Sequence, residues 1–207
     1  FSTANTEALA SELEDIGAKA VSVAGDITKS TVILDMVSAA INTFGKIDIL
    51  VNNVGGGSAN EIHDKDNPLA EAEAIWDGTY AMSLRAPVLM CEAVLPHFIE
   101  RKSGKIINMS SLAGRPGMPH VDLVPLSASY HSAKAGLIRY TQLLADQVGR
   151  YNINVNAICP GIIYTDGWRE ISEAMVTNHP QFKGEDPREW FKGVGEGRYA
   201  GEGMPQT

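Results

Sequence analysis

Tyr130 and Lys134 are four residues apart in a segment of helical composition, which places both side chains on one face of a helix. A phenol titrates near about 10, and an ammonium group close by favours the phenolate and lowers that pKa. Such a pair can exchange a proton near neutral pH. Ser111 ends a preceding apolar run, and its hydroxyl can bond an oxygen whose charge changes. The three residues are candidates for acid/base chemistry, but the same spacing is also typical of an aromatic ring packed on a lysine stem.

The elements that must position these residues alternate along the chain. We predict strands at 20–23, 47–51, 105–109 and 153–158, and helices at 6–17, 28–41, 78–102 and 127–150. The run at 47–51 is nearly all apolar, as in a strand covered on both faces. The alternation predicts an α/β fold with a Rossmann-like, doubly wound parallel sheet. Ligands bind at the carboxyl ends of such strands, which here carry small or polar residues: Gly25 and Asp26, 52–57, Ser110 and Ser111, and 159–161.

The composition limits the possible partners. The chain has 207 residues, of which 44% are hydrophobic, enough for a sizeable core in one domain. Its formal net charge of −8 repels phosphate backbones and anionic lipids, so we expect neither nucleic acid nor membrane as a partner. No stretch reaches the roughly 18 apolar residues of a membrane span, and the first residues do not resemble a signal sequence. Two cysteines without CxxC spacing, and histidines without ligand spacing, predict no metal site and a reducing, cytoplasmic compartment.

Five motifs occur in the order and spacing of one known family. The segment from Tyr130 to Lys134 (YHSAK) resembles the Tyr-x-Ala/Ser-x-Lys centre of the classical short-chain dehydrogenase/reductase family. The run at 104–111 (GKIINMSS) resembles the strand that leads to the catalytic serine of that family, here Ser111. The other three resemble its Asn-Asn-Ala-Gly, Asp-Val and Pro-Gly-x-Ile/Val-x-Thr segments, and they lie at 52–55 (NNVG), 25–28 (GDIT) and 160–165 (PGIIYT).

The resemblance implies an NAD(P)-dependent oxidoreductase that interconverts a secondary alcohol and a ketone. In this role Tyr130 transfers the proton, Lys134 lowers the pKa of Tyr130 and bonds the nicotinamide ribose, and Ser111 orients the carbonyl. Either NAD or NADP is implied as the cofactor, and the substrate class stays open among sugars, steroids, hydroxy acids, acyl thioesters and cyclic ketones. Besides Tyr130 and Lys134, the motifs imply these cofactor-binding residues: Asp26, Ile27, Asn53, Val54, Gly55, Pro160, Gly161, Ile163 and Thr165.

Ser83 departs from the family pattern. It stands where the family has an asparagine that keeps a water in the proton relay from the lysine. A serine can still bond water, but its reach is shorter. Ser83 is therefore either a catalytic residue in an altered relay or a small residue that allows close helix packing.

Two parts of the family pattern have no counterpart in the sequence: the Thr-Gly-x-x-x-Gly-x-Gly turn after the first strand, and the last helix and strand. We therefore expect residues 1–207 to be a single Rossmann-fold domain whose N-terminal and C-terminal elements belong to a longer protein. A product of this length alone would lack the helix N-terminus that binds pyrophosphate. The residue that selects NAD or NADP lies in the same missing part.

Other segments suggest further roles. Residues 162–207 mix Trp168, Trp190 and Phe191 with charges and show no clear period, which we interpret as a substrate lid or a subunit-contact segment. The loop at 115–125 overhangs the expected site, where His120 and Asp122 are candidates to shape a substrate pocket. The helices predicted at 78–102 and 127–150 resemble those through which family members pair, which implies a homodimer or homotetramer.

Two alternative functions stay open. A lyase or epimerase of the extended branch also uses Tyr-x-x-x-Lys, but the segments at 52–55 and 160–165 resemble the classical branch. A catalytically silent nicotinamide-binding sensor or structural protein would fit the departure at Ser83, whereas it has no need of Ser111, Tyr130 and Lys134 together.

Overall fold

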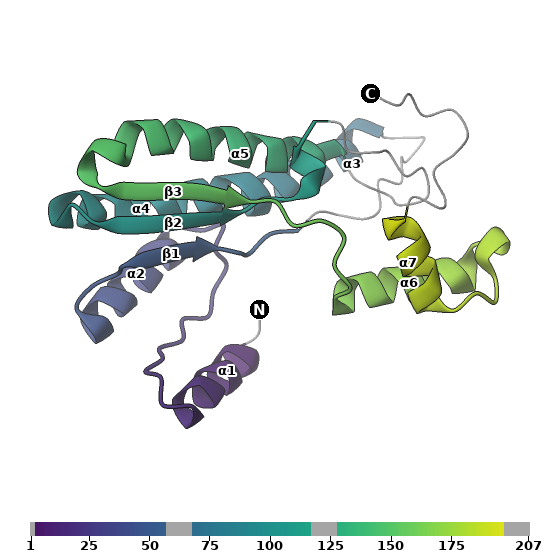
Figure 1. The fold of residues 1–207 in the computed structure, drawn as a ribbon, viewed down its shortest axis with the longest axis horizontal. Helices are drawn as coiled ribbons and strands as arrows, with labels where there is room; N and C mark the ends of the chain where they lie inside the picture. Colours follow the sequence, from purple (N-terminus) through teal and green to yellow (C-terminus); the bar gives the residue numbers. More distant parts are fainter. Residues whose placement is uncertain (1–2, 57–67, 117–127, 197–207) are drawn as a thin grey trace.

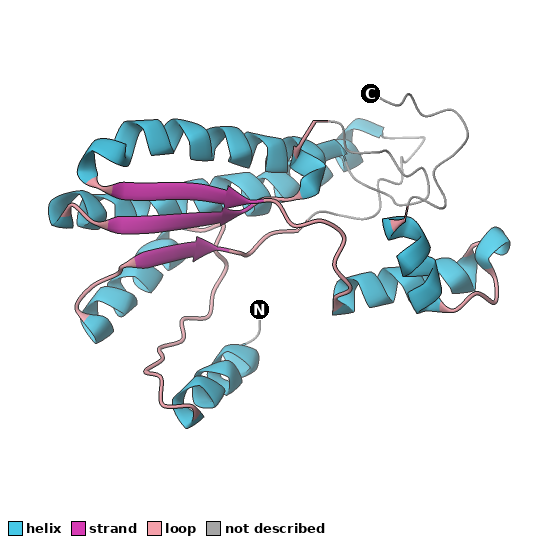
Figure 2. Cartoon of the chain, in the orientation of Figure 1, coloured by secondary structure: helices cyan, strands magenta, loops and turns pink. Residues whose placement is uncertain are grey.

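Three parallel strands form the centre of the molecule. The computed structural model describes residues 3–56, 68–116 and 128–196 (Figure 1). Strands β1 (Ile49–Asn52), β2 (Gly104–Met109) and β3 (Ile153–Ile158) pair in the order β1-β2-β3. Ile106 on β2 faces Leu50 of β1 and Val155 of β3 in register. Figure 2 shows that all three strands point the same way, so their carboxyl ends meet at one edge. The predicted α/β fold with a parallel, Rossmann-like sheet is confirmed.

Helices α4 (Ala86–Arg101) and α5 (Ala128–Val148) pack on this sheet, and α2 (Ser30–Phe44) packs on α4. Side chains alternate between the faces of a strand. Ile106, Ile153 and Val155 are accordingly buried and join Phe98 and Leu144 in one core cluster. Burial of such side chains contributes about 1.5–3 kcal/mol each.

The opposite face of the sheet is open in the described part of the chain. Ile49 is 54% exposed and Val51 is 53% exposed, whereas the sequence predicts cover on both faces of this strand. Their alternate neighbour Leu50 is half-buried against the core cluster. The described helices thus cover only the face of β1 that carries Leu50. The apolar side chains of Ile49 and Val51 lie on the other face, which these helices leave open.

The strand predicted at 20–23 is absent from the described structure. Residues 18–25 have no regular secondary structure, although α1 (Thr3–Asp15) precedes them much as predicted. A strand needs a neighbour to satisfy its backbone, and no described strand lies beside this run. Leu9 and Ile16, on the expected apolar stripe of α1, are 56% and 79% exposed because α1 has no extensive packing partner in the described structure (Figure 1).

The helix predicted at 78–102 is longer and contains an irregular turn. α3 (Pro68–Tyr80) continues through a π-helical turn, η1 (Ala81–Arg85), into α4. The stretch from Ala72 to Arg101 is long and apolar enough to cross a membrane by length and composition, contrary to our reading of the sequence. It supplies Cys91, Val94 and Phe98 to the core cluster, so part of its apolar surface packs in the core.

Two further helices have a small core of their own. α6 (Asp166–Asn178) and α7 (Pro187–Gly195) pack together around Phe182, Trp190 and Val194. Thr165 caps α6, since its Oγ1 accepts a hydrogen bond from Trp168 N, and Asp186 caps α7. The part of 162–207 that is described is therefore mostly helix, which the sequence analysis did not predict. Residues 197–207 lie outside the description.

Candidate active site

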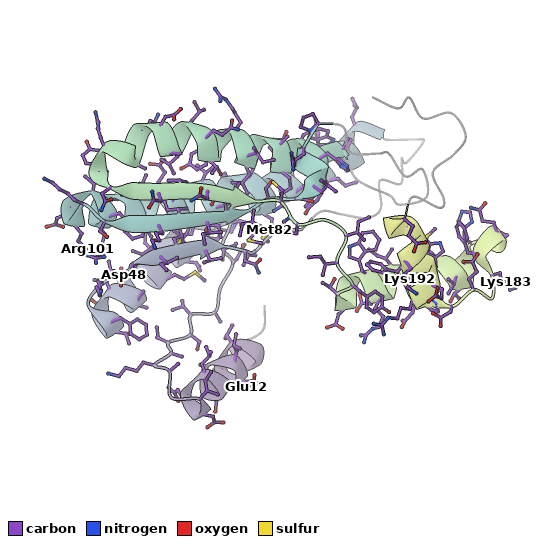
Figure 3. The ribbon with its side chains drawn as sticks, viewed as in Figure 1. Glu12, Asp48, Met82, Arg101, Lys183 and Lys192 are labelled. Carbon is purple, nitrogen blue, oxygen red and sulfur yellow. The ribbon has the colours of Figure 1, made fainter. Side chains whose placement is uncertain are left out.

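The tips of β2 and β3 are fastened together beyond the strands themselves. Ser110 N donates to Ile158 O at 2.8 Å, and Leu112 N donates to Pro160 O at 2.9 Å. Figure 3 places Met82, in η1, near these tips, and the ion pair of Asp48 with Arg101 at the opposite end of the sheet. The small and polar residues predicted at strand ends therefore gather at one edge for β1, β2 and β3, whereas the run before Gly25 and Asp26 is not a strand.

Tyr130 and Lys134 lie together on α5. The Lys134 Nζ atom is 5.6 Å from the centroid of the Tyr130 ring. The same ammonium group donates to Met109 O, at the tip of β2, at 2.8 Å. One of its three N–H bonds is thereby used. Lys134 is only 4% exposed, and this burial lowers the pKa of its ammonium group, which a thiolate at Cys159 would oppose.

Ser110 and Gly114 hold α5 against the tip of β2. Ser110 Oγ donates to Lys134 O at 2.8 Å. A Cβ atom on Gly114 would lie 2.6 Å from the carbonyl carbon of Lys134, so only glycine permits this approach. Neither residue is among the predicted site residues, although both follow the strand that leads to Ser111. In the sequence, the signal that could have identified them is a serine and a glycine placed just after a predicted strand.

Ser111 lies at the same tip in a half-buried position. Its Oγ accepts a hydrogen bond from Ala113 N at 3.1 Å and caps the short helix η2 (Leu112–Gly114). This bond uses an oxygen lone pair and leaves the hydroxyl proton for another acceptor. Ser111 is two residues along the chain from Met109, whose carbonyl oxygen accepts the hydrogen bond from Lys134.

Gly55 lies against Lys134, and Ser83 bonds to the next residue, Gly56. Ser83 is fully buried in η1; its Oγ donates to Gly56 O at 2.6 Å and accepts from Gly56 N at 3.1 Å. A Cβ atom on Gly55 would lie 2.9 Å from Lys134 Nζ and 3.6 Å from Ser83 Oγ. Four predicted site residues, Tyr130, Lys134, Gly55 and Ser83, therefore form one contiguous group.

Several predicted cofactor-binding residues line a pocket beside β1. Ile27, Asn53 and Val54 border this pocket of about 180 Å³, together with Met36, Leu50, Val51, Asn52, Ala86, Pro87 and Met90. Asp26 is exposed next to it, and its Oδ1 accepts from Thr28 N at 2.9 Å and from Thr28 Oγ1 at 2.7 Å. These two bonds hold the pKa of Asp26 below its usual value.

The predicted cofactor-binding residues after β3 are mostly exposed to solvent. Pro160 is half-buried and Gly161 is exposed, and Ile163 is 57% exposed. Thr165 is exposed, and its hydroxyl oxygen caps α6. The predicted residues of this segment thus lead from the tip of β3 to α6.

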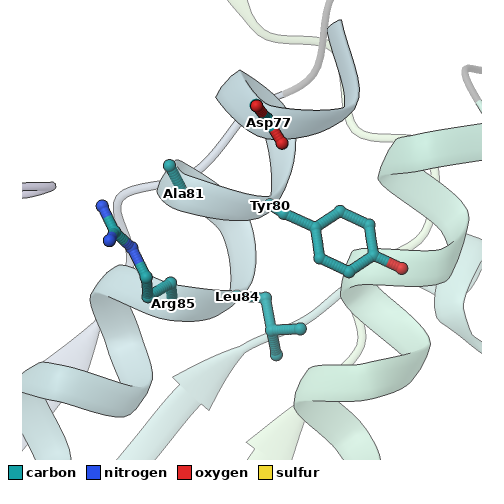
Figure 4. A pocket seen from close by; sticks show the side chains of 5 residues that line it. All are labelled: Asp77, Tyr80, Ala81, Leu84 and Arg85. Atoms are coloured by element: carbon teal, nitrogen blue, oxygen red, sulfur yellow. The ribbon is translucent and has the colours of Figure 1, made fainter. Parts of the chain in front are cut away.

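A larger pocket of about 460 Å³ lies along α3 and η1 rather than at the strand tips. It is lined by Asp77, Tyr80, Ala81, Leu84 and Arg85 (Figure 4). None of these residues is a predicted site residue, and Arg85 donates from Nη2 to Thr28 O at 3.1 Å. The loop residues His120 and Asp122 lie outside the described residues, as does all of 117–127.

A buried polar network that the sequence analysis did not predict connects β1, β2 and α5. Asn108 is fully buried; its Oδ1 accepts from Asn52 Nδ2 at 2.9 Å, and its Nδ2 donates to Thr141 Oγ1 at 2.9 Å. Thr141 Oγ1 donates to Leu137 O at 2.7 Å. Cys91 borders the network, and burial raises the pKa of its thiol to about 12. The sequence signal for this network was the asparagine at position 108, inside an otherwise apolar predicted strand.

Comparison with known proteins identifies this arrangement. A family model described as short chain dehydrogenase matches residues 2–176. The chain belongs to the short-chain dehydrogenase family. A relative in this family, the 3-oxoacyl-[acyl-carrier-protein] reductase FabG of Chlamydia muridarum, is 33% identical over 203 residues, which are 94% of this chain and 71% of the relative.

Two solved structures extend the comparison to bound cofactors. L-sorbose reductase from Gluconobacter frateurii, complexed with NADPH and L-sorbose, matches this short-chain dehydrogenase with a TM-score of 0.79 and 25% identity. The match covers 94% of this chain and 68% of that one. NAD⁺-bound xylitol dehydrogenase matches with a TM-score of 0.74 and 25% identity, over 93% of this chain and 72% of that one. The chain spans 58% of the length of another curated relative that it matches.

Proposed function

We propose that this member of the short-chain dehydrogenase family interconverts a secondary alcohol and a ketone with NAD or NADP. The observation that carries the proposal is the group at the strand tips: Tyr130 beside the buried ammonium of Lys134, with Ser111 on the same tip as Met109. A positive charge beside a phenol favours the phenolate, which suits proton exchange with an alcohol.

The residues present fit a nicotinamide cofactor. Gly55 has no Cβ atom, which would meet the Lys134 ammonium at 2.9 Å, and the bond to Met109 O uses only one of the three N–H donors of that group. Ile27, Asn53 and Val54 border the pocket beside β1, and the second carboxylate oxygen of Asp26 is available for an amino group. When bound, the cofactor would accept or supply the hydride.

Each proposed catalytic residue has a separate task. Tyr130 takes the proton of the alcohol in oxidation and returns it in reduction. Lys134 stabilises the charged phenolate and holds the ribose hydroxyls, and Ser111 donates its free proton to the substrate oxygen. We assign the remaining ribose and nicotinamide contacts to Gly55, Pro160, Gly161, Ile163 and Thr165.

We extend the proposal to the rest of the chain. Residues 1–207 form one domain, in which the α6–α7 segment acts as substrate lid or subunit contact. A homodimer or homotetramer would cover Trp76 on α3 and Leu143 on α5, which are 39% and 45% exposed. The two free cysteines, Cys91 and Cys159, support a reducing, cytoplasmic compartment.

Tyr130→Phe tests the proposal against Tyr140→Phe on the same helix. The protein at its natural length is given NAD⁺ or NADP⁺ with a panel of secondary alcohols, and the reduced-nicotinamide absorbance is followed. We expect Tyr130→Phe to lower kcat by about 10²–10⁴-fold because it removes the acid/base group. Tyr140, whose hydroxyl donates to Glu92 Oε1 at 3.2 Å, is outside the site, and its variant should retain kcat.

A silent sensor is the alternative, favoured by the substitution at Ser83. It would bind cofactor, shown by quenching of tryptophan fluorescence, without turnover of any ketone or alcohol in the panel. Equal activity of Tyr130→Phe and the parent would also contradict the proposed chemistry.

A further inference from the structure

The segment that leaves β3 is joined to α7 by aromatic and cationic side chains. Tyr164 lies between Ile163 and Thr165, two of the residues proposed above to contact the nicotinamide. Its ring meets the Phe191 ring edge-on, with centroids 4.9 Å apart. The guanidinium carbon of Arg188 lies 5.4 Å from the centroid of the same Tyr164 ring. Arg188 and Phe191 therefore share the face of α7 that Tyr164 contacts, as their spacing on a helix allows.

The Tyr164 ring and a helix cap together position Arg188. Asp186 caps α7, and its Oδ1 accepts a hydrogen bond from Arg188 N at 2.9 Å, which fixes the backbone that carries the side chain. Two other cations of the α6–α7 segment, Arg169 and Lys192, lie 3.3 Å and 2.9 Å from a carboxylate oxygen. In the described part of the chain, no Asp or Glu side chain forms an ion pair with Arg188. Its charge is thus held by stacking and is not neutralised by a described carboxylate.

A stacked guanidinium group keeps its donors for another group. The contact with the ring uses the flat face of the guanidinium, whereas its five N–H donors point outward in the plane. This planar fork matches a carboxylate, which it can bind through two parallel hydrogen bonds. Arg188 is exposed, so an anion from solution can reach these donors.

We propose that Arg188, stacked on Tyr164, is a specificity-determining residue that selects substrates with a carboxylate group, that is, a hydroxy acid and its oxo acid. This inference rests on the proposed function and names the substrate class of the same site. Figure 1 shows α6 and α7 beyond the arrowheads of the strands, at the edge where the carboxyl ends meet. Because Tyr164 directly follows Ile163, its ring lies next to the proposed nicotinamide contacts. The part of the substrate away from its reacting carbon then extends toward Arg188.

A phosphate group of the cofactor offers an arginine the same negative charge and the same oxygen acceptors. The two sources of the anion differ in their kinetics. Binding of a substrate carboxylate by Arg188 affects kcat/KM for acids and leaves neutral substrates unaffected. Binding of a cofactor phosphate would instead affect the KM for the cofactor with every substrate.

Matched substrate pairs test the inference in the protein at its natural length. The pairs are hydroxy acids, with the hydroxyl at increasing distance from the carboxylate, and their primary amides. We expect the parent to prefer an acid, and Arg188→Gln to lower the ratio of kcat/KM for acid over amide about tenfold, as for loss of a charge-assisted hydrogen bond. Arg188→Lys keeps the charge without the fork and should retain only part of the preference. Arg169→Gln is the matched control, since Arg169 is already paired with Asp166, and should match the parent.

The ring beneath Arg188 gives a second test. Tyr164→Leu removes the aromatic face and should lower the same ratio, whereas Tyr164→Phe keeps the ring and should retain most of the preference. Both variants leave the Arg188 side chain present, so the difference between them measures what the ring contributes. Equal ratios in the two variants would contradict the stacking role of Tyr164.

Binding without turnover separates failure of this inference from failure of the proposed function. With oxidised cofactor a ketone is not reduced, so the affinities of an oxo acid and its amide can be compared by tryptophan fluorescence; Trp168 lies 5.5 Å from the Phe191 ring. Tighter binding of the oxo acid in the parent, lost in Arg188→Gln, would support the anion site even if no alcohol were oxidised. Equal binding of acid and amide in the parent would overturn the inference, as would a raised cofactor KM in Arg188→Gln with an unchanged acid-to-amide ratio.

Discussion

The two hydrophobic clusters of this chain are built in different ways. The sheet cluster joins residues from Cys91 to Val155, drawn from two helices and two strands, and it is largely aliphatic. The second cluster, Phe182, Trp190 and Val194, draws on neighbours within 162–176 and is rich in aromatic rings. Trp168 and Tyr164 both meet the Phe191 ring edge-on, with centroids 5.5 and 4.9 Å away.

The comparison shows why the proposed chemistry lies on the sheet cluster. Tyr130 and Lys134 need to be fixed relative to Met109, Ser110 and Gly55, which are distant in sequence. A cluster of long-range contacts provides this fixation, whereas a local helix pair can adjust without moving the strand tips. The sheet is thus suited to hold the reacting groups, whereas the proposed substrate lid or subunit contact rests on the local core of α6–α7.

The largest expected effect tests whether the two clusters are independent. Phe98→Ala and Trp190→Ala each remove a fully buried aromatic ring, at a typical cost of about 3–5 kcal/mol. We expect Phe98→Ala to lower the free energy of unfolding of the sheet domain. Trp190→Ala should expose 166–195 to proteolysis while amide exchange in β2 and β3 stays slow. Faster exchange in the strands of Trp190→Ala would show that the two clusters unfold together.

A smaller effect is expected from the polar network, which occurs beside the sheet cluster. Thr141→Val leaves the Asn108 amide without its partner at a fully buried site, at about 1–3 kcal/mol. Thr141→Ser keeps the hydroxyl and is the matched control. Urea unfolding of both variants measures the difference; equal stability of Val and Ser at this position would mean that the amide finds another partner.

The buried ammonium group should give the sheet region a pH dependence that is absent from α6–α7. Burial lowers the folded-state pKa of Lys134 below 10.5. Between these two values the unfolded chain binds more protons, so the contribution of this group to the free energy of unfolding rises with pH, by at most about 1.4 kcal/mol per unit. Lys134→Met should lose this rise relative to the parent in urea unfolding at several alkaline pH values. Parallel curves would argue against the lowered pKa.

The smallest effect is expected at the surface of α7. Lys192 Nζ lies 2.9 Å from Glu189 Oε1, but both side chains are more than half exposed. Lys192→Gln should therefore change the midpoint of thermal unfolding little, corresponding to about 0.5 kcal/mol or less. A larger shift would reveal that the α6–α7 pair depends on charge as well as on its aromatic core.

The sequence predicted the fold most accurately where periodicity was strong. The strand predicted at 153–158 has the observed bounds, and those at 47–51 and 105–109 differ by two residues or fewer at their ends. The run at 20–23 has the same β-prone composition but no described strand beside it, so local preference alone did not make a strand. The helices of 166–195 were missed although both are amphipathic and begin at local capping residues, Thr165 and Asp186, so the signals were in the sequence and were not used.

For the site, residue types and order were readable but contacts were not. The pairing of Tyr130 with Lys134 follows from helical geometry, which depends only on spacing. The partners of Ser83 and Asn108 do not, since Gly56 and Thr141 are 27 and 33 residues away in sequence. Only the packing of strands and helices brings such pairs within bonding distance.

The sequence by itself therefore determined the alternation of strands and helices, the strand end at Ser111 and the helical pair on α5. The tertiary structure alone decided that the Ser83 hydroxyl bonds to a loop, that Lys134 is buried against Met109, and that α6–α7 has a separate core. The physical reason is the distance along the sequence over which each effect acts. Periodicity and spacing act within a few residues, whereas burial and hydrogen-bond partners depend on which distant segments fill the same space.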